Sequence, residues 1–254
     1  MSRWDVFQDQ VIVITGAASG FGRILANKLS VEGAKLVLAD INAEPLARVA
    51  AELALPDNAV TTTCDVAVEL EVKTLVEQAR DVFGRLDIMV NNAGLGTAPK
   101  LLIDTTEEDM DINYAVNTKG VFFGIKYGIR QMLAQSPPGG IVLNVSSMAG
   151  IGGAPMIGAY AAAKHAVVGL TKTAAYEYAA KGVRVNAICP FFSPTPLVTD
   201  AELGQKMDSF ARSTPMKRLG DPEEMVEVML MLMSPANSYM NGQAVGVDGG
   251  MSAI

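Results

Sequence analysis

The chain has 254 residues, half of them hydrophobic, which is typical of a globular protein with a sizeable core and excludes an intrinsically disordered chain. Acidic residues outnumber basic ones by 27 to 20, and the net charge of −7 argues against nucleic acid or an anionic membrane as a partner. The two cysteines and one histidine are too few for a disulfide framework, a thiolate zinc site or a metal-dependent hydrolase. We therefore expect no metal site, and a chemistry that depends on hydroxyl, carboxylate, amide or lysine groups or on an organic cofactor.

The N-terminal residues lack the long apolar stretch of a signal peptide, so we expect a cytoplasmic protein. The segment between Arg130 and Lys164 contains no Asp, Glu, Lys or Arg and is long enough to cross a bilayer. This segment contains Pro137, Pro138 and Pro155 together with several glycines and polar residues. It therefore fits a buried strand, a polar turn and the start of a helix better than a helix that crosses a bilayer.

Short runs of β-branched and apolar residues alternate with longer segments of helical periodicity along the chain. The predicted strands are residues 11–15, 35–40, 59–65, 86–91, 140–146, 183–188 and 244–248. The predicted helices are residues 20–32, 43–54, 67–83, 106–134, 160–181 and 221–233. Most of the strand runs are continuously apolar, as in strands that are buried on both faces of a parallel sheet. We predict an α/β fold: one doubly wound Rossmann-type domain over residues 1–254, with a seven-stranded parallel sheet and helices on both faces.

One long irregular stretch interrupts this alternation between Pro190 and about Gly220. It contains four prolines and a cluster of apolar residues. Irregular segments of this length are uncommon in compact domains and are often functional. We predict that residues 190–220 form a lid or a substrate loop.

A glycine-rich turn follows the first predicted strand, with glycines at positions 16, 20 and 22. Glycines at a strand-to-helix junction allow a tight turn and let a pyrophosphate approach the backbone N–H groups at the positive end of the helix. An ordinary turn can contain the same residues, so the argument depends on the position of the turn in a strand–helix–strand unit. The predicted cofactor contacts here are Gly16, Ser19, Gly20, Phe21 and Gly22.

The second predicted strand ends at Asp40, about 20 residues after the glycine-rich turn. A carboxylate at this point can accept hydrogen bonds from the ribose hydroxyls of an adenosine, and it would repel a 2′-phosphate. Neither the turn nor Ile41, the next predicted contact, supplies an arginine or lysine for that phosphate. These residues favour NAD over NADP, while the alternative is that Asp40 only caps a helix or lies on the surface.

A tyrosine and a lysine, Tyr160 and Lys164, lie four residues apart near the start of a predicted helix, on one face of it. An unperturbed tyrosine has a pKa of about 10 and is a poor base at neutral pH, so a nearby cation is needed to favour its phenolate. The same spacing is common on ordinary amphipathic helices. A catalytic function is favoured because Ser146 and Ser147 end the fifth predicted strand, at the carboxyl edge where open α/β sheets bind ligands.

Taken together, these motifs resemble those of the short-chain dehydrogenase/reductase family over essentially the whole chain. The motifs that appear in the family's order are the glycine-rich turn, Asn91-Asn92-Ala93-Gly94, Asn117, Ser147, Tyr160, Lys164 and Pro190. The resemblance implies that Tyr160 is the acid/base and that Ser147 holds the substrate oxygen. It also implies that Lys164 binds the nicotinamide ribose and lowers the tyrosine pKa. Asn117 would hold a water that connects Lys164 to solvent.

The resemblance implies further contacts to the cofactor. Asp65 and Val66 would meet the adenine, and Asn92, Ala93 and Gly94 would line the cofactor. The remaining implied contacts are Tyr160, Lys164, Pro190, Phe192 and Thr195, the last at the position of the family's carboxamide-binding threonine. The chain departs from the family pattern here, because a glycine usually follows the proline and this chain has Phe191. This difference leaves the backbone path of the loop and its nicotinamide contacts open.

The loops beyond the strand ends contribute mostly apolar side chains, which predicts a hydrophobic substrate pocket. The candidate pocket residues are Leu95, Met148, Met156, Ile157, Phe191, Leu197, Met207 and Phe210. We therefore expect an NAD(H)-dependent oxidoreductase that interconverts a hydrophobic secondary alcohol, bulky or cyclic ones included, and its ketone. The alternative for these side chains is that they fill the core or a subunit contact.

Two other functions stay open. Arg212, Lys217 and Arg218 leave room for an anionic tail, which supports a 3-hydroxyacyl thioester dehydrogenase or 3-oxoacyl reductase. A catalytically idle NAD-sensing or scaffold protein is the remote alternative, since such a protein has no need of all four catalytic residues. The family resemblance also implies a homotetramer, with residues 106–134 and 160–181 at one interface and residues 246–254 near another.

Overall fold

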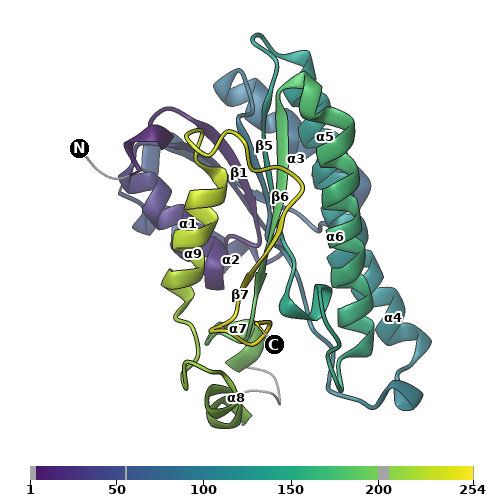
Figure 1. The fold of residues 1–254 in the computed structure, drawn as a ribbon. Coiled ribbons are helices and arrows are strands. Elements are labelled where there is room, and N and C mark those ends of the chain that lie inside the picture. The colour runs from purple at the N-terminus through teal and green to yellow at the C-terminus, as the bar shows by residue number, and fades with distance from the viewer. Residues whose placement is uncertain (1–3, 55, 200–205, 254) are drawn as a thin grey trace.

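The computed structural model describes residues 4–54, 56–199 and 206–253, and a parallel sheet with strand order β3-β2-β1-β4-β5-β6-β7 crosses its centre (Figure 1). The strands are β1 (Val11–Thr15), β2 (Lys35–Asp40), β3 (Ala59–Thr63), β4 (Ile88–Asn91), β5 (Gly140–Val145), β6 (Val183–Pro190) and β7 (Ala244–Val247). The longer helices are α1 (Gly20–Val31), α2 (Ala43–Glu52), α3 (Glu69–Phe83), α5 (Val121–Ala134), α6 (Gly158–Tyr178) and α9 (Pro222–Met233). Neighbouring strands of this sheet pair in parallel, so the predicted seven-stranded Rossmann-type fold is confirmed.

Helices lie on both faces of the sheet (Figure 1), and the side chains of the central strands alternate between the two cores beneath them. Ile12 and Ile14 of β1 belong to the core on the side of α1 and α9, whereas Val11 and Val13 belong to the core on the side of α3, α5 and α6. Every residue of β1 and β4 is buried, while the edge strands β3 and β7 have no buried residue. Burial on both faces explains why the central strands have continuously apolar sequences.

The predicted helix over residues 106–134 is divided into three parts in the structure. It consists of α4 (Glu107–Asn113), a π-helical segment η4 (Tyr114–Gly120) and α5. The expectation of one continuous helix was wrong in this detail, because a π-helical turn changes the apolar periodicity too little to be detected in the sequence. Such segments occur frequently at functional sites, and this one contains Asn117.

The predicted lid has local helical structure. It contains α7 (Pro196–Thr199) and α8 (Met207–Ser213), which lie beyond the carboxyl ends of the strands (Figure 1). Residues 200–205 of the predicted lid lie outside the described residues. Its first residue, Pro190, is the last residue of β6 and pairs with Val247 of β7.

The uncharged segment between Arg130 and Lys164 forms the end of α5, strand β5 and the start of α6, as its prolines and glycines favoured. Among the residues that the structure describes, no helix combines the length and apolarity that a bilayer crossing requires.

A chain of buried polar side chains connects β4, β5 and α6. Nδ2 of Asn91 donates to Oδ1 of Asn144 (2.8 Å), and Nδ2 of Asn144 donates to Oγ1 of Thr171 (2.8 Å). Oγ1 of Thr171 in turn donates to the carbonyl oxygen of Val167 (2.8 Å). Buried amides are costly unless they are hydrogen-bonded, so this chain favours one placement of α6 on the sheet. That placement determines where the N-terminal half of α6 meets the strand ends.

Gly124 of α5 tests this packing, because a Cβ at this position would overlap Oδ1 of Asn91. We expect Gly124→Ala to lower the free energy of unfolding by about 1–3 kcal/mol, as measured by urea denaturation. Gly153→Ala is the control, because a Cβ at Gly153 would have no atom within 4 Å, and its effect should stay below about 1 kcal/mol. Equal stability of Gly124→Ala and the wild type would contradict the observed contact between α5 and β4.

Candidate functional site

The glycine-rich turn between β1 and α1 is packed so closely that side chains would not fit. Gly16 and Gly20 have φ angles of 66° and 50°, in the left-handed region that favours glycine. A Cβ at Gly22 would overlap the carbonyl oxygen of Gly16, and a Cβ at Gly16 would lie 2.8 Å from Cα of Ala93. Because these positions are glycines, no side chain covers the backbone of the turn, and a ligand can approach it.

The N-terminus of α1, directly after this turn, fits an anionic group. The side chain of Ser19 makes no capping hydrogen bond, and the first turn of the helix contains no acidic residue. The N–H groups and the positive end of the helix dipole are therefore not neutralised by the protein. Phe21 belongs to this first turn, and its side chain packs against the core while its backbone N–H stays one of the groups at the helix N-terminus. The turn and the helix end together suit the pyrophosphate of a dinucleotide cofactor.

Asp40, at the end of β2, is 9% exposed and lies beside the glycine-rich turn. One carboxylate oxygen accepts a hydrogen bond from N of Ala18 (3.0 Å), and the other accepts one from N of Asn42 (2.9 Å). Asn42, not Asp40, is the residue that precedes α2, so the alternative of a helix cap or an exposed surface carboxylate is wrong. Ile41 is exposed next to it and supplies no positive charge.

Asp65 and Val66 follow β3 at the same edge of the sheet. N of Cys64 donates to the carbonyl oxygen of Asp40 (2.9 Å), which places this segment next to the end of β2. Val66 is buried, and Oδ1 of Asp65 accepts a hydrogen bond from N of Ala67 (2.9 Å). The two residues predicted to meet the adenine therefore lie beside the predicted ribose contact.

The loop after β4 is tied to the glycine-rich turn. N of Asn92 and N of Ala93 both donate to Oγ1 of Thr15 (3.0 and 3.1 Å), and Nδ2 of Asn92 donates to the carbonyl oxygens of Thr15 and Gly16 (2.9 and 3.0 Å). Gly94 follows, and its lack of a side chain matters as well. A Cβ there would lie 2.9 Å from Oδ1 of Asn117. Thr15 therefore holds the two predicted cofactor loops together.

The four predicted catalytic residues converge at this edge from three elements. Asn117 lies in η4, Ser147 follows β5, and Tyr160 and Lys164 lie in the first turns of α6. Tyr160 and Ser147 share a hydrogen bond, and Nζ of Lys164 lies 5.5 Å from the centroid of the Tyr160 ring. Nζ of Lys164 also lies near Gly94, since a Cβ there would be 3.5 Å away. A hydroxyl, a phenol, an ammonium and an amide are thus brought together beside the cofactor loops.

The surroundings shift the pKa values of the two titratable groups. Burial raises the pKa of Tyr160 to about 12, and the hydrogen bond with Ser147 offsets this only in part. Burial lowers the pKa of Lys164 to about 8. The expectation that Lys164 lowers the tyrosine pKa is not met by the protein alone: desolvation dominates, the lowering comes from the hydrogen bond with Ser147, and Nζ of Lys164 donates to the carbonyl oxygen of Val145 (2.8 Å).

The residue that replaces the family's glycine causes no backbone distortion. Phe191 has no left-handed φ, and its N donates to the carbonyl oxygen of Val247 (3.0 Å), so the pairing of β6 with β7 continues through it. Further along this loop, Thr195 is 7% exposed and lies against the glycine-rich turn. A Cβ at Gly20 would be 3.5 Å from Cβ of Thr195. The loop therefore returns to the start of α1, as the predicted position of Thr195 requires.

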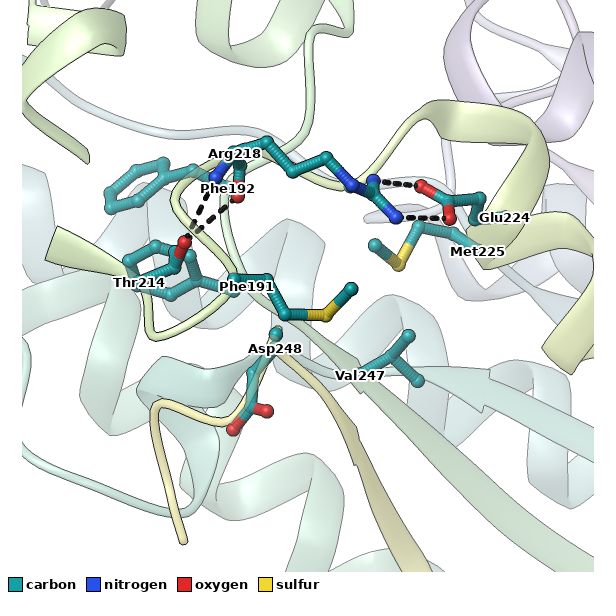
Figure 2. Close-up of a pocket in the computed structure, with 11 residues that line it drawn as sticks. Phe191, Phe192, Thr214, Arg218, Glu224, Met225, Val247 and Asp248 are labelled. Carbon is teal, nitrogen blue, oxygen red and sulfur yellow. Dashed lines mark hydrogen bonds and ion pairs between the residues drawn. The ribbon is translucent and has the colours of Figure 1, made fainter. Parts of the chain in front are cut away.

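Figure 2 shows a pocket of about 120 Å³ between the lid and the end of β7. Phe191, Met216 and Met225 give it apolar walls, and the ion pair of Arg218 with Glu224 lies along one side (Figure 2). None of the four predicted catalytic residues lines this pocket. Phe191 thus lines a pocket next to the lid, and its ring meets that of Phe192 edge-on with centroids 4.9 Å apart; its assignment to the substrate pocket stays a prediction.

The other predicted pocket residues lie in two groups. Leu95, Met156, Ile157 and Leu197 lie on segments next to the catalytic residues. Leu95 is bonded to the side chain of Asn117, and Ile157 directly precedes α6. N of Lys100 donates to the carbonyl oxygen of Met156 (2.8 Å), Lys100 pairs with Ile157, and a Cβ at Gly96 would lie 4.0 Å from Leu197. Met148 follows Ser147, while Met207 and Phe210 belong to α8. The ring of Phe210 stacks on that of Phe192 with centroids 4.0 Å apart. Phe192, a predicted cofactor contact, is thus part of the lid packing.

Two basic residues at the end of the lid already have hydrogen-bond partners. Arg218 makes two hydrogen bonds with the carboxylate of Glu224 (2.6 and 2.7 Å), and Nζ of Lys217 donates to the carbonyl oxygen of Arg212 (3.0 Å). The charge of Arg218 is therefore already compensated. Over the described ranges, no group of three or more His, Cys, Asp or Glu side chains has the arrangement of a metal site.

Sequence reasoning missed Asn113, which lies four residues before Asn117 and is fully buried. Its Oδ1 accepts a hydrogen bond from Nδ2 of Asn117 (2.9 Å). An asparagine on the same helical face as a predicted catalytic residue was the available signal, but burial of that face was not evident from the local sequence.

Comparison with known proteins agrees with this geometry. A family model described as "Enoyl-(Acyl carrier protein) reductase" matches residues 16–252. Levodione reductase of Leifsonia aquatica is 39% identical over 97% of this chain and 96% of its own length. A 3-oxoacyl-[acyl-carrier-protein] reductase of Thermotoga maritima is 39% identical over 96% of this chain and 98% of its own length. Cyclohexanol dehydrogenase of an Acinetobacter species is 37% identical over 96% and 95% of the two chains.

A solved structure adds a cofactor to the comparison. The 3-ketoacyl-(acyl-carrier-protein) reductase of Brucella melitensis, crystallised with NADH, superposes with a TM-score of 0.90 at 35% identity. The superposition covers 97% of this chain and 99% of that one. The fold is therefore shared with proteins of the family that the sequence resembles.

We expect the stacked rings of Phe192 and Phe210 to hold the lid in place. We expect Phe210→Ala to accelerate limited proteolysis within residues 196–214 by roughly two- to tenfold, since an aromatic pair contributes about 0.5–1.5 kcal/mol beyond the area it buries. Phe210→Tyr, which keeps the ring, is the control and should be cleaved at the wild-type rate. Identical cleavage of the alanine variant would show that the stack does not hold the lid.

Proposed function

The chain belongs to the short-chain dehydrogenase/reductase family, and on this premise we propose that it interconverts a hydrophobic secondary alcohol, bulky or cyclic, and its ketone with NAD(H). The family membership makes the chain an oxidoreductase, and the family uses nicotinamide cofactors. The single observation that carries the proposal is the convergence of Asn117, Ser147, Tyr160 and Lys164 beside Gly94 and the glycine-rich turn.

The protein's own groups supply the proton chemistry. A bound nicotinamide ring supplies or accepts the hydride. In alcohol oxidation the Tyr160 phenolate takes the hydroxyl proton, and Ser147 hydrogen-bonds the substrate oxygen as its charge changes. In ketone reduction Tyr160 returns the proton to that oxygen. Lys164 holds the cofactor ribose and stabilises the phenolate together with the positive charge of the oxidised cofactor, and Asn117 holds a water that connects Lys164 to solvent.

The pKa of Tyr160, about 12 in the protein alone, means that its phenolate is scarce at neutral pH until additional positive charge approaches the ring. We therefore propose that proton abstraction becomes efficient only in the complex with the oxidised cofactor. The low pKa of Lys164, about 8, allows it to exchange a proton near neutral pH.

The apolar residues around the catalytic edge support a hydrophobic substrate. Leu95, Met156, Ile157 and Leu197 are contributed by three separate segments that meet there. The names of two relatives, levodione reductase and cyclohexanol dehydrogenase, are consistent with a small cyclic substrate. Methionine adapts its shape to different partners, which suits a pocket for bulky alcohols.

A 3-hydroxyacyl thioester dehydrogenase or 3-oxoacyl reductase is the second candidate. It is favoured by the relative from Thermotoga maritima, which is named as such a reductase. It is disfavoured by the ion pair of Arg218 with Glu224, which removes one of the cations expected to bind an anionic tail. A cofactor-sensing protein without turnover is disfavoured by the complete set of four catalytic residues.

We also propose that residues 1–254 are a single catalytic domain that assembles as a homotetramer in the cytoplasm. Assembly is supported by apolar side chains exposed beside α4, among them Leu102 at 75% and Ile103 at 90%, which a partner subunit would cover. The cytoplasmic location is supported by Cys64 and Cys189, which are buried free thiols, as in reducing compartments.

Tyr160→Phe tests the proposed chemistry. We expect kcat to fall by at least about 10²-fold, because the phenol that transfers the proton is removed, while the Kd for NADH changes less than about threefold. Turnover is followed by NADH absorbance with secondary alcohols, ketones and 3-oxoacyl thioesters in parallel, and binding by NADH fluorescence. Tyr178→Phe, near the other end of α6, is the control and should retain full activity. Turnover by Tyr160→Phe at the wild-type rate would rule out the assigned role, and turnover of thioesters alone would favour the second candidate.

We expect the carboxylate of Asp40 to determine the preference for NAD over NADP. We expect kcat/KM with NAD to exceed that with NADP by at least about tenfold, because the carboxylate repels a 2′-phosphate. Asp40→Asn keeps the shape and removes the charge, so the ratio should fall at least severalfold. Glu44→Gln removes an exposed charge in the first turn of α2 and should leave the ratio unchanged. A wild-type preference for NADP would show that the assignment of Asp40 is wrong.

A further inference from the structure

Asn113 is the last residue of α4 and directly precedes the π-helical segment that contains Asn117. Both asparagines are 0% exposed. A buried amide group is strongly destabilising unless its N–H groups and oxygen find partners. The partners of these two amides therefore indicate what the pair holds in place.

The two amides use all four of their side-chain N–H groups. Nδ2 of Asn117 donates to the carbonyl oxygen of Leu95 (2.9 Å) and to Oδ1 of Asn113 (2.9 Å). Nδ2 of Asn113 donates to the carbonyl oxygen of Asp109 (2.9 Å) and to Oγ1 of Thr97 (3.3 Å). Rotation of either amide by half a turn would direct N–H groups at other N–H groups. The orientation of each side chain is therefore determined by the other.

These bonds hold residues 95–97 from one side. Leu95 is bonded at both its N–H and its carbonyl group to the side chain of Asn117 (3.0 and 2.9 Å). Thr97, two residues later, is bonded to the side chain of Asn113 (3.3 Å). Asn113 therefore reaches this segment by two routes, directly through Thr97 and indirectly through Asn117.

The held segment separates the cofactor loop from the lid. It follows Gly94, which lies close to two of the catalytic residues. A Cβ at Gly94 would be 2.9 Å from Oδ1 of Asn117 and 3.5 Å from Nζ of Lys164. At Gly96 it faces Leu197 of α7, whose Cδ1 would be 4.0 Å from a Cβ. A displacement of this segment would change the space for the nicotinamide end of a cofactor and for a substrate under the lid.

We propose that Asn113 is a positioning residue that acts through Asn117 and Thr97 to fix residues 95–97 between the cofactor loop and the lid. The consequence for catalysis rests on the proposed function, whereas the consequence for the segment itself does not. A residue that only completes the end of α4 would contribute to stability without changing the segment or its ligands.

The test compares two substitutions of buried asparagines. Asn113→Leu removes the amide beside the site, and Asn186→Leu removes one in β6 that is 1% exposed and bonded to Met240 (2.9 Å) and Gln243 (3.0 Å). Thr97→Val removes only the direct route from Asn113. Asn113→Ser, which keeps a hydroxyl donor in a smaller side chain, replaces the leucine variant if that one does not fold.

Hydrogen–deuterium exchange reports directly on the segment, because the N–H of Leu95 is bonded to Asn117. We expect Asn113→Leu to accelerate exchange in residues 93–98 by roughly tenfold. At a temperature well below Tm, the Kd for NADH and the KM for the alcohol should rise by roughly three- to tenfold. Thr97→Val should give a smaller acceleration, and Asn186→Leu should lower Tm without any of these changes.

Unchanged exchange in residues 93–98 and unchanged NADH affinity in the Asn113 variant would overturn the proposal, even with a lowered Tm. Equal acceleration by Asn186→Leu would overturn it as well, since the effect would then be general destabilisation. Failure of the proposed function has a different signature, namely a wild-type protein that neither binds NADH nor turns over alcohols, ketones or thioesters. The exchange comparison decides the role of Asn113 in that case too.

Discussion

Seven parallel strands between two layers of helices must bring all of their carboxyl ends to one edge of the sheet. That constraint collects Asp40, the loop of Asn92, Ser147 and the lid at a single place, although they come from distant parts of the chain. The sheet interior supplies the stability, because its strands have no polar face to present to water. Polar and charged groups can lie at this edge, whereas the same groups without hydrogen-bond partners would be destabilising in the core.

Close approach of backbones is the second requirement at this edge. The glycine-rich turn contacts the loop after β4 so tightly that a Cβ at Gly16 would lie 2.8 Å from Ala93, and Thr15 receives hydrogen bonds from that loop. Directly after this contact, the side chain of Ser19 makes no capping hydrogen bond and the first turn of α1 contains no acidic residue. The close packing of the two loops and the helix N-terminus that suits an anionic group therefore lie at the same place.

Two residues outside the catalytic set shape the surroundings of the candidate site. Phe191 continues the pairing of β6 with β7 and places its ring under the lid, where Phe192 and Phe210 stack. Asn113 extends the hydrogen bonds of Asn117 to Thr97. Phe191 acts on the lid through aromatic packing, and Asn113 acts on residues 95–97 through buried amides.

The sequence alone determined the fold class and the edge of the sheet at which the candidate site lies. The apolar runs, the glycine-rich turn and Asp40 were sufficient for the parallel sheet and the cofactor edge, because they follow from local patterns such as strand burial and helix starts. Only the tertiary structure decided the π-helical segment around Asn117, the path of Phe191 and the partners of Asn113. It also decided that the Tyr160 pKa rises in the protein alone. These properties depend on burial and on contacts between distant segments, which neither residue spacing nor composition contains.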